Sequence, residues 1–142
     1  MKEVEGLVLP YQHSKELFDS SIKIDTVFVW VSYKNIPTYK NITTGYNTFL
    51  MLKKTALKEY EGFMMYPAPT VQELIEWLPD AIDSRAIDYE CLTIGGYDSS
   101  KEAVLYTSLD ENRLICGEEY DGNDLKQNLK DMCLWVRKEG YK

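Results

Sequence analysis

Residues 66–79, Y-P-A-P-T-V-Q-E-L-I-E-W-L-P, contain the start, the apolar face and the end of one helix. Thr70 can cap the first backbone N–H groups of this helix, and Glu73, three residues later, can reach back to the cap, which is the capping-box pattern. Apolar side chains follow at the spacing of a 3.6-residue period: Val71, Leu74, Ile75 and Leu78. Because Pro79 cannot continue a helix, the stretch predicts one short helix that ends there and packs on an apolar surface.

The residues before this stretch predict a short helix and a hairpin. After an extended segment at residues 7–10, Ser14 can cap a helix that ends near residue 20. Residues 27–33 are rich in β-branched and aromatic side chains and are followed by turn residues, so they are expected to pair with residues 38–43.

Residues 45–62 fit two structures. In a helix, four side chains of this segment would share one face: Phe49, Leu52, Ala56 and Tyr60. Residues 48–52 would also suit a third strand, so the pattern leaves both alternatives open. Residues 63–66 are expected to form a brief strand, and the capped helix is expected to continue past Pro79 as a loose turn through Ile82.

The second half of the chain predicts a meander and a closing helix. Three strands are expected, separated by turns after Gly95 and at residues 110–112: residues 87–94, 103–108 and 114–118. Residues 121–124 open the last helix and Gly140 ends it. The apolar stripe of this helix consists of Leu125, Leu129, Met132 and Val136.

This layout predicts an α+β fold. The hairpin and the three-strand meander would form an antiparallel sheet, with two or three helices packed on one face. A chain of 142 residues suits one core, and no repeat, low-complexity tract or Ser/Gly linker divides it. We therefore expect a single domain over residues 1–142.

One predicted strand is apolar on both faces. In residues 27–31 the odd positions are all valine, while the even positions are Phe28 and Trp30. Either residues 45–62 cover the second face or a partner does, and we favour cover within the chain. If a partner covers it instead, Phe28 and Trp30 become binding residues.

The formal net charge of −7 lies in the second half of the chain. Residues 1–69 hold 8 basic and 7 acidic side chains, whereas residues 70–142 hold 8 basic and 16 acidic ones. This balance argues against binding to duplex nucleic acid, where Lys and Arg must neutralise phosphates. The longest apolar run is far shorter than the roughly 20 residues of a membrane-spanning helix, and the first residues do not resemble a signal peptide. We expect a cytoplasmic protein with no membrane contact.

The cysteines and the single histidine offer little for catalysis or metal binding. Cys91, Cys116 and Cys133 are odd in number and lack a C-x-x-C pattern, which is typical of a reducing compartment, although a bridge between Cys91 and Cys116 is an alternative. A thiol–imidazole pair would have to combine one of them with His13. One histidine without a close cysteine pair fails the ligand count of a zinc site, and we expect no cofactor and no metal.

Four acidic residues gather before the last helix: Glu118, Glu119, Asp121 and Asp124. Converging carboxylates bind hard cations, but this spacing lacks the alternating ligands of a calcium loop. Acidic residues are also favoured at a helix N-terminus by the macrodipole, and we prefer this structural interpretation. Gly95-Gly96 matches no phosphate-binding loop and is expected to be a turn.

The order of these elements, with the motif P-A-P-T-V-Q-E-L-I-E-W-L-P at residues 67–79 and L-W-V-R-K-E-G at residues 134–140, resembles small uncharacterised proteins of gut anaerobes and of their phages or mobile elements. The resemblance covers most of the chain and implies a single-domain α+β protein. It implies no catalytic residues and no cofactor.

Acidic charge, aromatic content and missing catalytic motifs favour a non-enzymatic accessory protein that binds another protein or self-associates. A narrower hypothesis is an immunity or anti-defence protein that neutralises a basic toxin or nuclease. Two alternatives stay open: a small thiol-dependent enzyme, and a binder of single-stranded nucleic acid that uses some of the 11 tyrosines.

Overall fold

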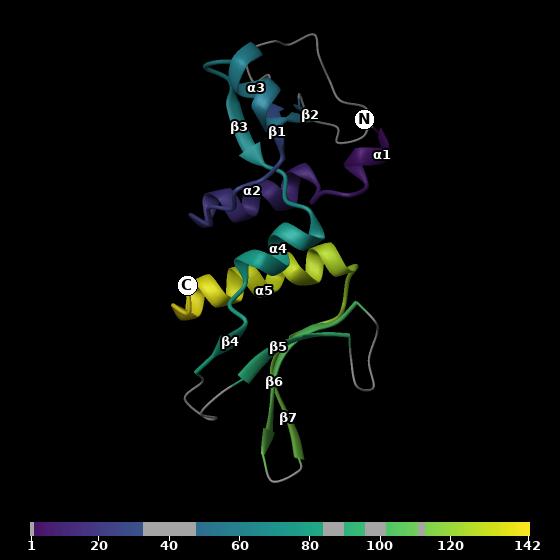
Figure 1. The fold of residues 1–142 in the computed structure, drawn as a ribbon, viewed down its shortest axis with the longest axis vertical. Coiled ribbons are helices and arrows are strands. Elements are labelled where there is room, and N and C mark those ends of the chain that lie inside the picture. The colour runs from purple at the N-terminus through teal and green to yellow at the C-terminus, as the bar shows by residue number, and fades with distance from the viewer. Residues whose placement is uncertain (1, 33–47, 84–89, 96–101, 111–112) are drawn as a thin grey trace. The chain divides into compact units, whose positions relative to one another are not determined.

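The computed structural model describes residues 2–32, 48–83, 90–95, 102–110 and 113–142 (Figure 1). These residues form five helices and two antiparallel sheets, which confirms the predicted α+β class. The helices are α1 (Lys2–Glu5), α2 (Tyr11–Asp19), α3 (Lys53–Glu59), α4 (Val71–Trp77) and α5 (Leu125–Glu139). The strands are β1 (Phe28–Ser32), β2 (Thr48–Leu52), β3 (Met64–Pro67), β4 (Ala81–Ile82), β5 (Glu90–Ile94), β6 (Val104–Asp110) and β7 (Arg113–Tyr120).

The chain divides into two compact units, Met1–Glu73 and Leu74–Lys142, and the boundary falls inside α4. Each unit has its own sheet, so the strands do not join in the single sheet that the sequence suggests. β1 takes both of its partners, β2 and β3, from the first 73 residues, so the expected hairpin strand completes a sheet within its own unit. The prediction of one domain over residues 1–142 stays a prediction.

The sheet of the first unit has the order β2-β1-β3. β1 pairs antiparallel with β2, from Phe28 opposite Leu52 to Ser32 opposite Thr48, and antiparallel with β3 on its other side. The expected hairpin partner, residues 38–43, lies outside the described residues. Within the 45–62 segment, residues 48–59 adopt both of the structures that the pattern allows, since β2 is followed directly by α3.

Both faces of β1 are covered within the first unit. Trp30 is 1% exposed and packs with Tyr11 of α2 and with Tyr66 of β3. On the opposite face, Val29 and Val31 pack with Ala56 of α3. The favoured prediction is therefore confirmed: the 45–62 segment covers the second face. Helices consequently lie on both faces of this sheet, whereas the sequence analysis expected them on one.

The start of α2 differs from the prediction. The helix begins at Tyr11 with Pro10 in the cap position, and Pro10 makes no side-chain cap hydrogen bond. Pro10 has the fixed φ of a proline, −55°, and its carbonyl oxygen accepts the first helical hydrogen bond from Ser14 N at 2.9 Å. Ser14 is therefore inside the helix, buried, and its hydroxyl donates to the Leu9 carbonyl oxygen at 3.1 Å.

The capping box at the start of α4 is confirmed. Thr70 N donates to Glu73 Oε2 at 2.7 Å, and Glu73 N donates to Thr70 Oγ1 at 3.3 Å. The second carboxylate oxygen of Glu73 accepts a hydrogen bond from Val27 N at 2.9 Å. Glu73 therefore also ties the start of α4 to the residue before β1. The helix ends at Trp77, two residues before Pro79, and Leu74 and Leu78 are buried.

The second unit contains the predicted meander. Its sheet has the order β4-β5-β6-β7 with antiparallel pairing throughout. The expected loose turn at residues 79–82 is wrong, since Ala81 and Ile82 form β4. Pairing of Ala81 with Cys91 and a hydrogen bond from Leu92 N to the Asp80 carbonyl oxygen, 2.8 Å, hold this segment extended.

The last helix, α5, has the predicted ends. The Asp124 side chain accepts a hydrogen bond from Gln127 N at 2.9 Å, and Gly140 ends the helix with a left-handed φ of 80°. Three members of the predicted apolar stripe are buried: Leu129, Met132 and Val136. Trp135 lies 6.2 Å from the ring of Tyr106 in β6, so α5 packs on this sheet.

Candidate functional site

Asn128 fixes the connection between β7 and α5. Its side chain is fully buried and its Nδ2 donates to the carbonyl oxygens of Glu102 and Asn123, each at 2.9 Å. Its Oδ1 accepts a hydrogen bond from Asn123 N at 3.1 Å. A buried amide with these bonds satisfied restricts the loop to one conformation, so the residues on it are held in fixed positions.

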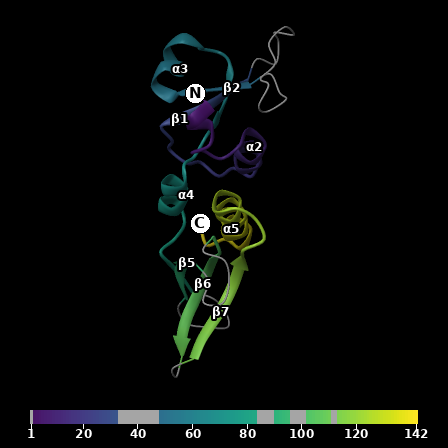
Figure 2. The same ribbon diagram turned by 90° about the vertical axis from the view of Figure 1, so that its right-hand side faces the viewer.

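Five carboxylates surround this connection, and we call them the acidic corner: Glu102, Glu118, Glu119, Asp121 and Asp124. All but the half-buried Glu118 are exposed. The strand register places Glu119 opposite Leu105 and Tyr120 opposite Val104, two residues after Glu102 in the chain. The end of β7, the start of β6 and the start of α5 lie at one end of the sheet (Figure 2), so the carboxylates in and beside these elements are brought to the same end.

Tyr120 lies in the acidic corner, and the pKa of its hydroxyl is raised. Burial, the hydrogen bond to Glu118 and the negative charges of Glu118 and Asp131 together raise the pKa of Tyr120 to about 12. Tyr120 stays a neutral hydroxyl at physiological pH and donates to the carboxylate beside it.

The charge of the chain is divided unequally between the two units. Residues 1–73 hold 8 basic and 8 acidic side chains, whereas residues 74–142 hold 8 basic and 15 acidic ones and so carry the net −7. Two lysines of the second unit already have partners within that unit. Lys130 is buried with its Nζ 2.9 Å from Asp131 Oδ1, and Lys142 Nζ lies 4.9 Å from the centre of the Trp77 ring.

Helix α5 separates the acidic corner from a basic end. Asp124 caps its first turn, whereas Arg137 and Lys138 lie in its last turn. A helix of 15 residues is about 22 Å long, and the Debye length at physiological salt is about 8 Å. The cations at the far end of α5 therefore do not neutralise the acidic corner.

The carboxylates do not converge into a cation site. No group of three or more His, Cys, Asp or Glu side chains within the described parts of the chain is arranged to hold a metal ion. The macrodipole interpretation accounts for Asp124, which caps α5. It does not extend to Glu118 and Glu119, because these residues belong to β7.

Phe28 and Trp30 do not form an open apolar face. Trp30 is 1% exposed, and its Nε1 donates to the Leu9 carbonyl oxygen at 3.0 Å. Phe28 is half-buried against the same core cluster. Trp30 is thus part of the core, and a binding role for Phe28 stays a prediction.

The register of the second sheet excludes a bridge between Cys91 and Cys116. Thr107 of β6 pairs with Cys91 of β5 on one side and with Cys116 of β7 on the other. Neighbouring strands lie about 4.8 Å apart, so the two Cα atoms are roughly 10 Å apart, beyond the limit of about 7 Å for a disulfide. The two cysteines lie on strands that are not adjacent.

The structure does not assemble a thiol–imidazole pair within either unit. His13 belongs to the first unit, where its Nδ1 lies 3.6 Å from Glu16 Oε1, and all three cysteines belong to the second. Cys91 is exposed. Cys133 is buried, and this burial raises the pKa of its thiol to about 12, which disfavours the reactive thiolate.

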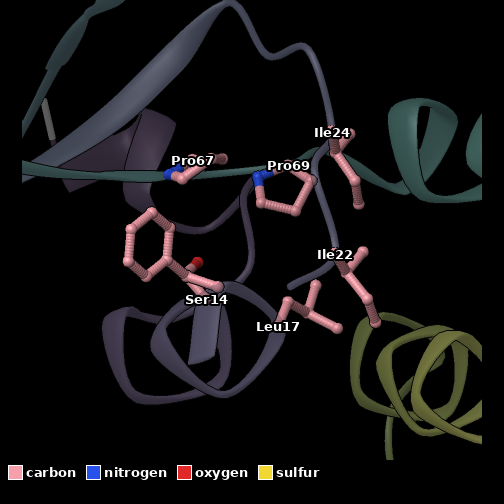
Figure 3. Close-up of a pocket in the computed structure, with 7 residues that line it drawn as sticks. Ser14, Leu17, Ile22, Ile24, Pro67 and Pro69 are labelled. Carbon is pink, nitrogen blue, oxygen red and sulfur yellow. The ribbon is translucent and has the colours of Figure 1, made fainter. Parts of the chain in front are cut away.

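An apolar depression lies on the first unit, beside α2 (Figure 3). Seven residues line it: Ser14, Leu17, Phe18, Ile22, Ile24, Pro67 and Pro69. The depression is too shallow to enclose a water molecule, so it is a hollow of the surface and not a ligand pocket.

No family model, no curated protein and no solved structure matches this chain. Function is therefore inferred from the residues and their geometry. Among the described residues, no helix is both long enough and apolar enough to cross a membrane.

Proposed function

We propose that this protein is a non-enzymatic accessory protein of the cytoplasm that binds a basic surface of another protein through the acidic corner. The observation that carries the proposal is the confinement of the net −7 to residues 74–142, where carboxylates in and beside three elements meet at one end of a sheet. Charge of one sign concentrated in this way steers and selects partners of the opposite sign.

The scaffold of the acidic corner supports the proposal. Asn128 holds the loop of the corner through three hydrogen bonds, so the backbone that carries Asp121 and Asp124 is fixed before any partner arrives. Pre-ordered groups lose less conformational entropy on binding than groups on a loose segment. A surface that served solubility alone would not need this arrangement.

The test compares two charge-reversal variants with equal charge changes. One carries Glu119→Lys with Asp121→Lys in the acidic corner. The other carries Glu59→Lys with Glu61→Lys, which are exposed in the first unit. Each variant and the wild type are immobilised and exposed to lysate of the organism of origin, and captured proteins are identified by mass spectrometry.

We expect the wild type and the Glu59/Glu61 variant to capture the same basic protein, and the acidic-corner variant to lose it. The association rate should fall by on the order of 10-fold or more in the acidic-corner variant, with a weaker salt dependence, because surface charges act mainly on the encounter step. Equal capture by all three proteins, or capture of no basic protein, would refute the proposal.

A further inference from the structure

The outer edge of β7 differs from other strand edges of this protein. β7 spans Arg113–Tyr120, about 27 Å for its 8 residues, and is the last strand in the order β4-β5-β6-β7. Figure 2 shows it as the outermost strand, beside β6. Within the described residues, no strand pairs with its outer side.

Two other edges carry the devices that block unwanted pairing. The opposite edge of the same sheet, β4, is only 2 residues long. In the first unit, β3 ends at Pro67, and beyond it the backbone is already used, because Leu9 N donates to the Pro69 carbonyl oxygen at 2.8 Å. Short strands, prolines and covered edges all prevent strand addition.

β7 is neither short nor interrupted by proline, and it contains no lysine. Its devices against pairing are three charged residues, Arg113, Glu118 and Glu119, and a β-bulge near its C-terminal end. Its pairing with β6 shifts register between Leu105 and Thr107, which leaves a regular run at residues 113–116. A strand edge offers a row of backbone N–H and C=O groups to an extended segment of another chain.

The charge at one end of β7 indicates which chain would pair with it. Glu118 and Glu119 lie in the strand, and Asp121 follows it. A second copy of this protein would bring another unit with a net charge of −7, so self-pairing is opposed by repulsion. A strand with Lys or Arg side chains can pair with the backbone of β7 and is attracted by its negative charge.

We propose that the basic partner binds by adding a β-strand to the outer edge of β7, with its cationic side chains beside Glu118 and Glu119. This inference depends on the proposed function for the existence of a basic partner. It adds the mode of binding, in which the backbone of β7 supplies affinity and the acidic corner supplies selectivity.

The test uses two synthetic peptides with the same charge. The first is a capped octapeptide in which pairs of Lys alternate with pairs of Val, so that each face of the added strand carries both residue types. The second has the same sequence with N-methyl groups on its four central residues, which removes the central N–H donors of both strand edges. Binding to the full chain is measured by calorimetry, and hydrogen exchange of the β7 amides is measured by NMR with and without each peptide.

We expect the unmethylated peptide to bind on the order of 10-fold or more tightly than the methylated one, because several backbone hydrogen bonds form with only one of them. Alternate amides of β7, those that do not donate to β6, should become protected from exchange. The amides of β4 should not change and serve as the internal control.

Three results would overturn strand addition. Equal binding of both peptides with no protection in β7 would leave a purely electrostatic role for the acidic corner. Binding of neither peptide would reject the β7 edge, while lysate capture would still decide the proposed function separately. A stable dimer in sedimentation that excludes the peptide would assign the edge to a second copy.

Discussion

Substitution of Glu73 tests whether one carboxylate holds the first unit together at the start of α4. Its Oε2 accepts hydrogen bonds from Thr70 N and Thr70 Oγ1, and its Oε1 accepts one from Val27 N, 46 residues away in the chain. The Glu73→Ala variant removes the acceptor of both backbone N–H groups. Loss of a cap and of a second charge-assisted bond at a partly exposed site should lower the free energy of unfolding by about 2–3 kcal/mol.

The Glu73→Gln variant separates the two backbone contacts. Glutamine keeps one acceptor oxygen but presents an N–H₂ group to the other amide, so we expect a loss of about 1 kcal/mol. The matched control is Glu59→Gln, which removes the same charge from an exposed position of the same unit and should stay within about 0.5 kcal/mol of the wild type.

Two assays report on this region. Urea unfolding followed by circular dichroism gives the free energy, and NMR hydrogen exchange follows the amides of Val27 and Thr70 directly. Exchange of both amides should accelerate in Glu73→Ala, by about 10-fold for each 1.4 kcal/mol lost locally. Unchanged exchange at Val27 together with unchanged stability would refute the conclusion that Glu73 links α4 to the start of β1.

Three further outcomes are expected. Asn128→Ala should destabilise the second unit by about 2–4 kcal/mol in urea unfolding, because removal of the side-chain amide leaves its three buried hydrogen-bond partners unsatisfied. A decrease in the free energy of unfolding below about 0.5 kcal/mol would contradict this role. Trp30→Ala should cost about 3–5 kcal/mol, and Trp30→Phe clearly less, because phenylalanine fills much of the space that alanine leaves empty. The loss of the indole hydrogen bond is the same in both variants, and the Leu9 carbonyl oxygen keeps its bond from Ser14 in both. Equal costs for the two variants would contradict this order. At neutral pH a thiol reagent followed by mass spectrometry should label Cys91 in the folded protein and Cys133 only after unfolding. The pKa of Cys133 rises on folding from 9.0 to about 12, so its contribution to stability is complete below pH 9 and is lost as the pH rises to about 12. If a Cys133→Ala variant lost the same amount of stability over this pH range as the wild type, Cys133 would not be the source of the loss.

The elements that were predicted correctly are those encoded by neighbouring residues. The capping box of α4 and the Asp124 and Gly140 ends of α5 depend on contacts within a few positions of the chain. Such local signals act regardless of which tertiary neighbours the segment acquires. The meander was predicted because its strands follow one another in the chain and pair in that order. The predicted cap of α2 was wrong, because Pro10 sets the start of the helix and the Ser14 hydroxyl donates to the Leu9 carbonyl oxygen from inside it.

Strand partners could not be predicted, because pairing is decided between segments far apart in the chain. Residues 45–62 showed a helical and a strand pattern, and the structure uses the first for α3 and the second for β2. Both elements serve β1, one by hydrogen bonding at its edge and the other by covering Val29 and Val31. A strand that is apolar on both faces requires two covering layers. Residues 45–62 were correctly predicted as one of them, whereas no local signal indicates that α2 contributes to the other.

The candidate site was visible in part. The excess of acidic residues in the second half was plain from the sequence, but the macrodipole interpretation grouped residues that the structure separates. The macrodipole acts within the first turn of a helix, so it accounts for Asp124 and leaves Glu118 and Glu119 on β7 unexplained.

Carboxylates gathered at one end of a sheet repel one another, which by itself lowers the stability of the folded state, and here they lie beside the buried Asn128 network. Asn128 itself carried no recognisable signal, since a polar residue near a helix start is commonly solvated. The proposed binding of a basic partner accounts for this arrangement, because the gathered carboxylates then attract a surface of opposite charge.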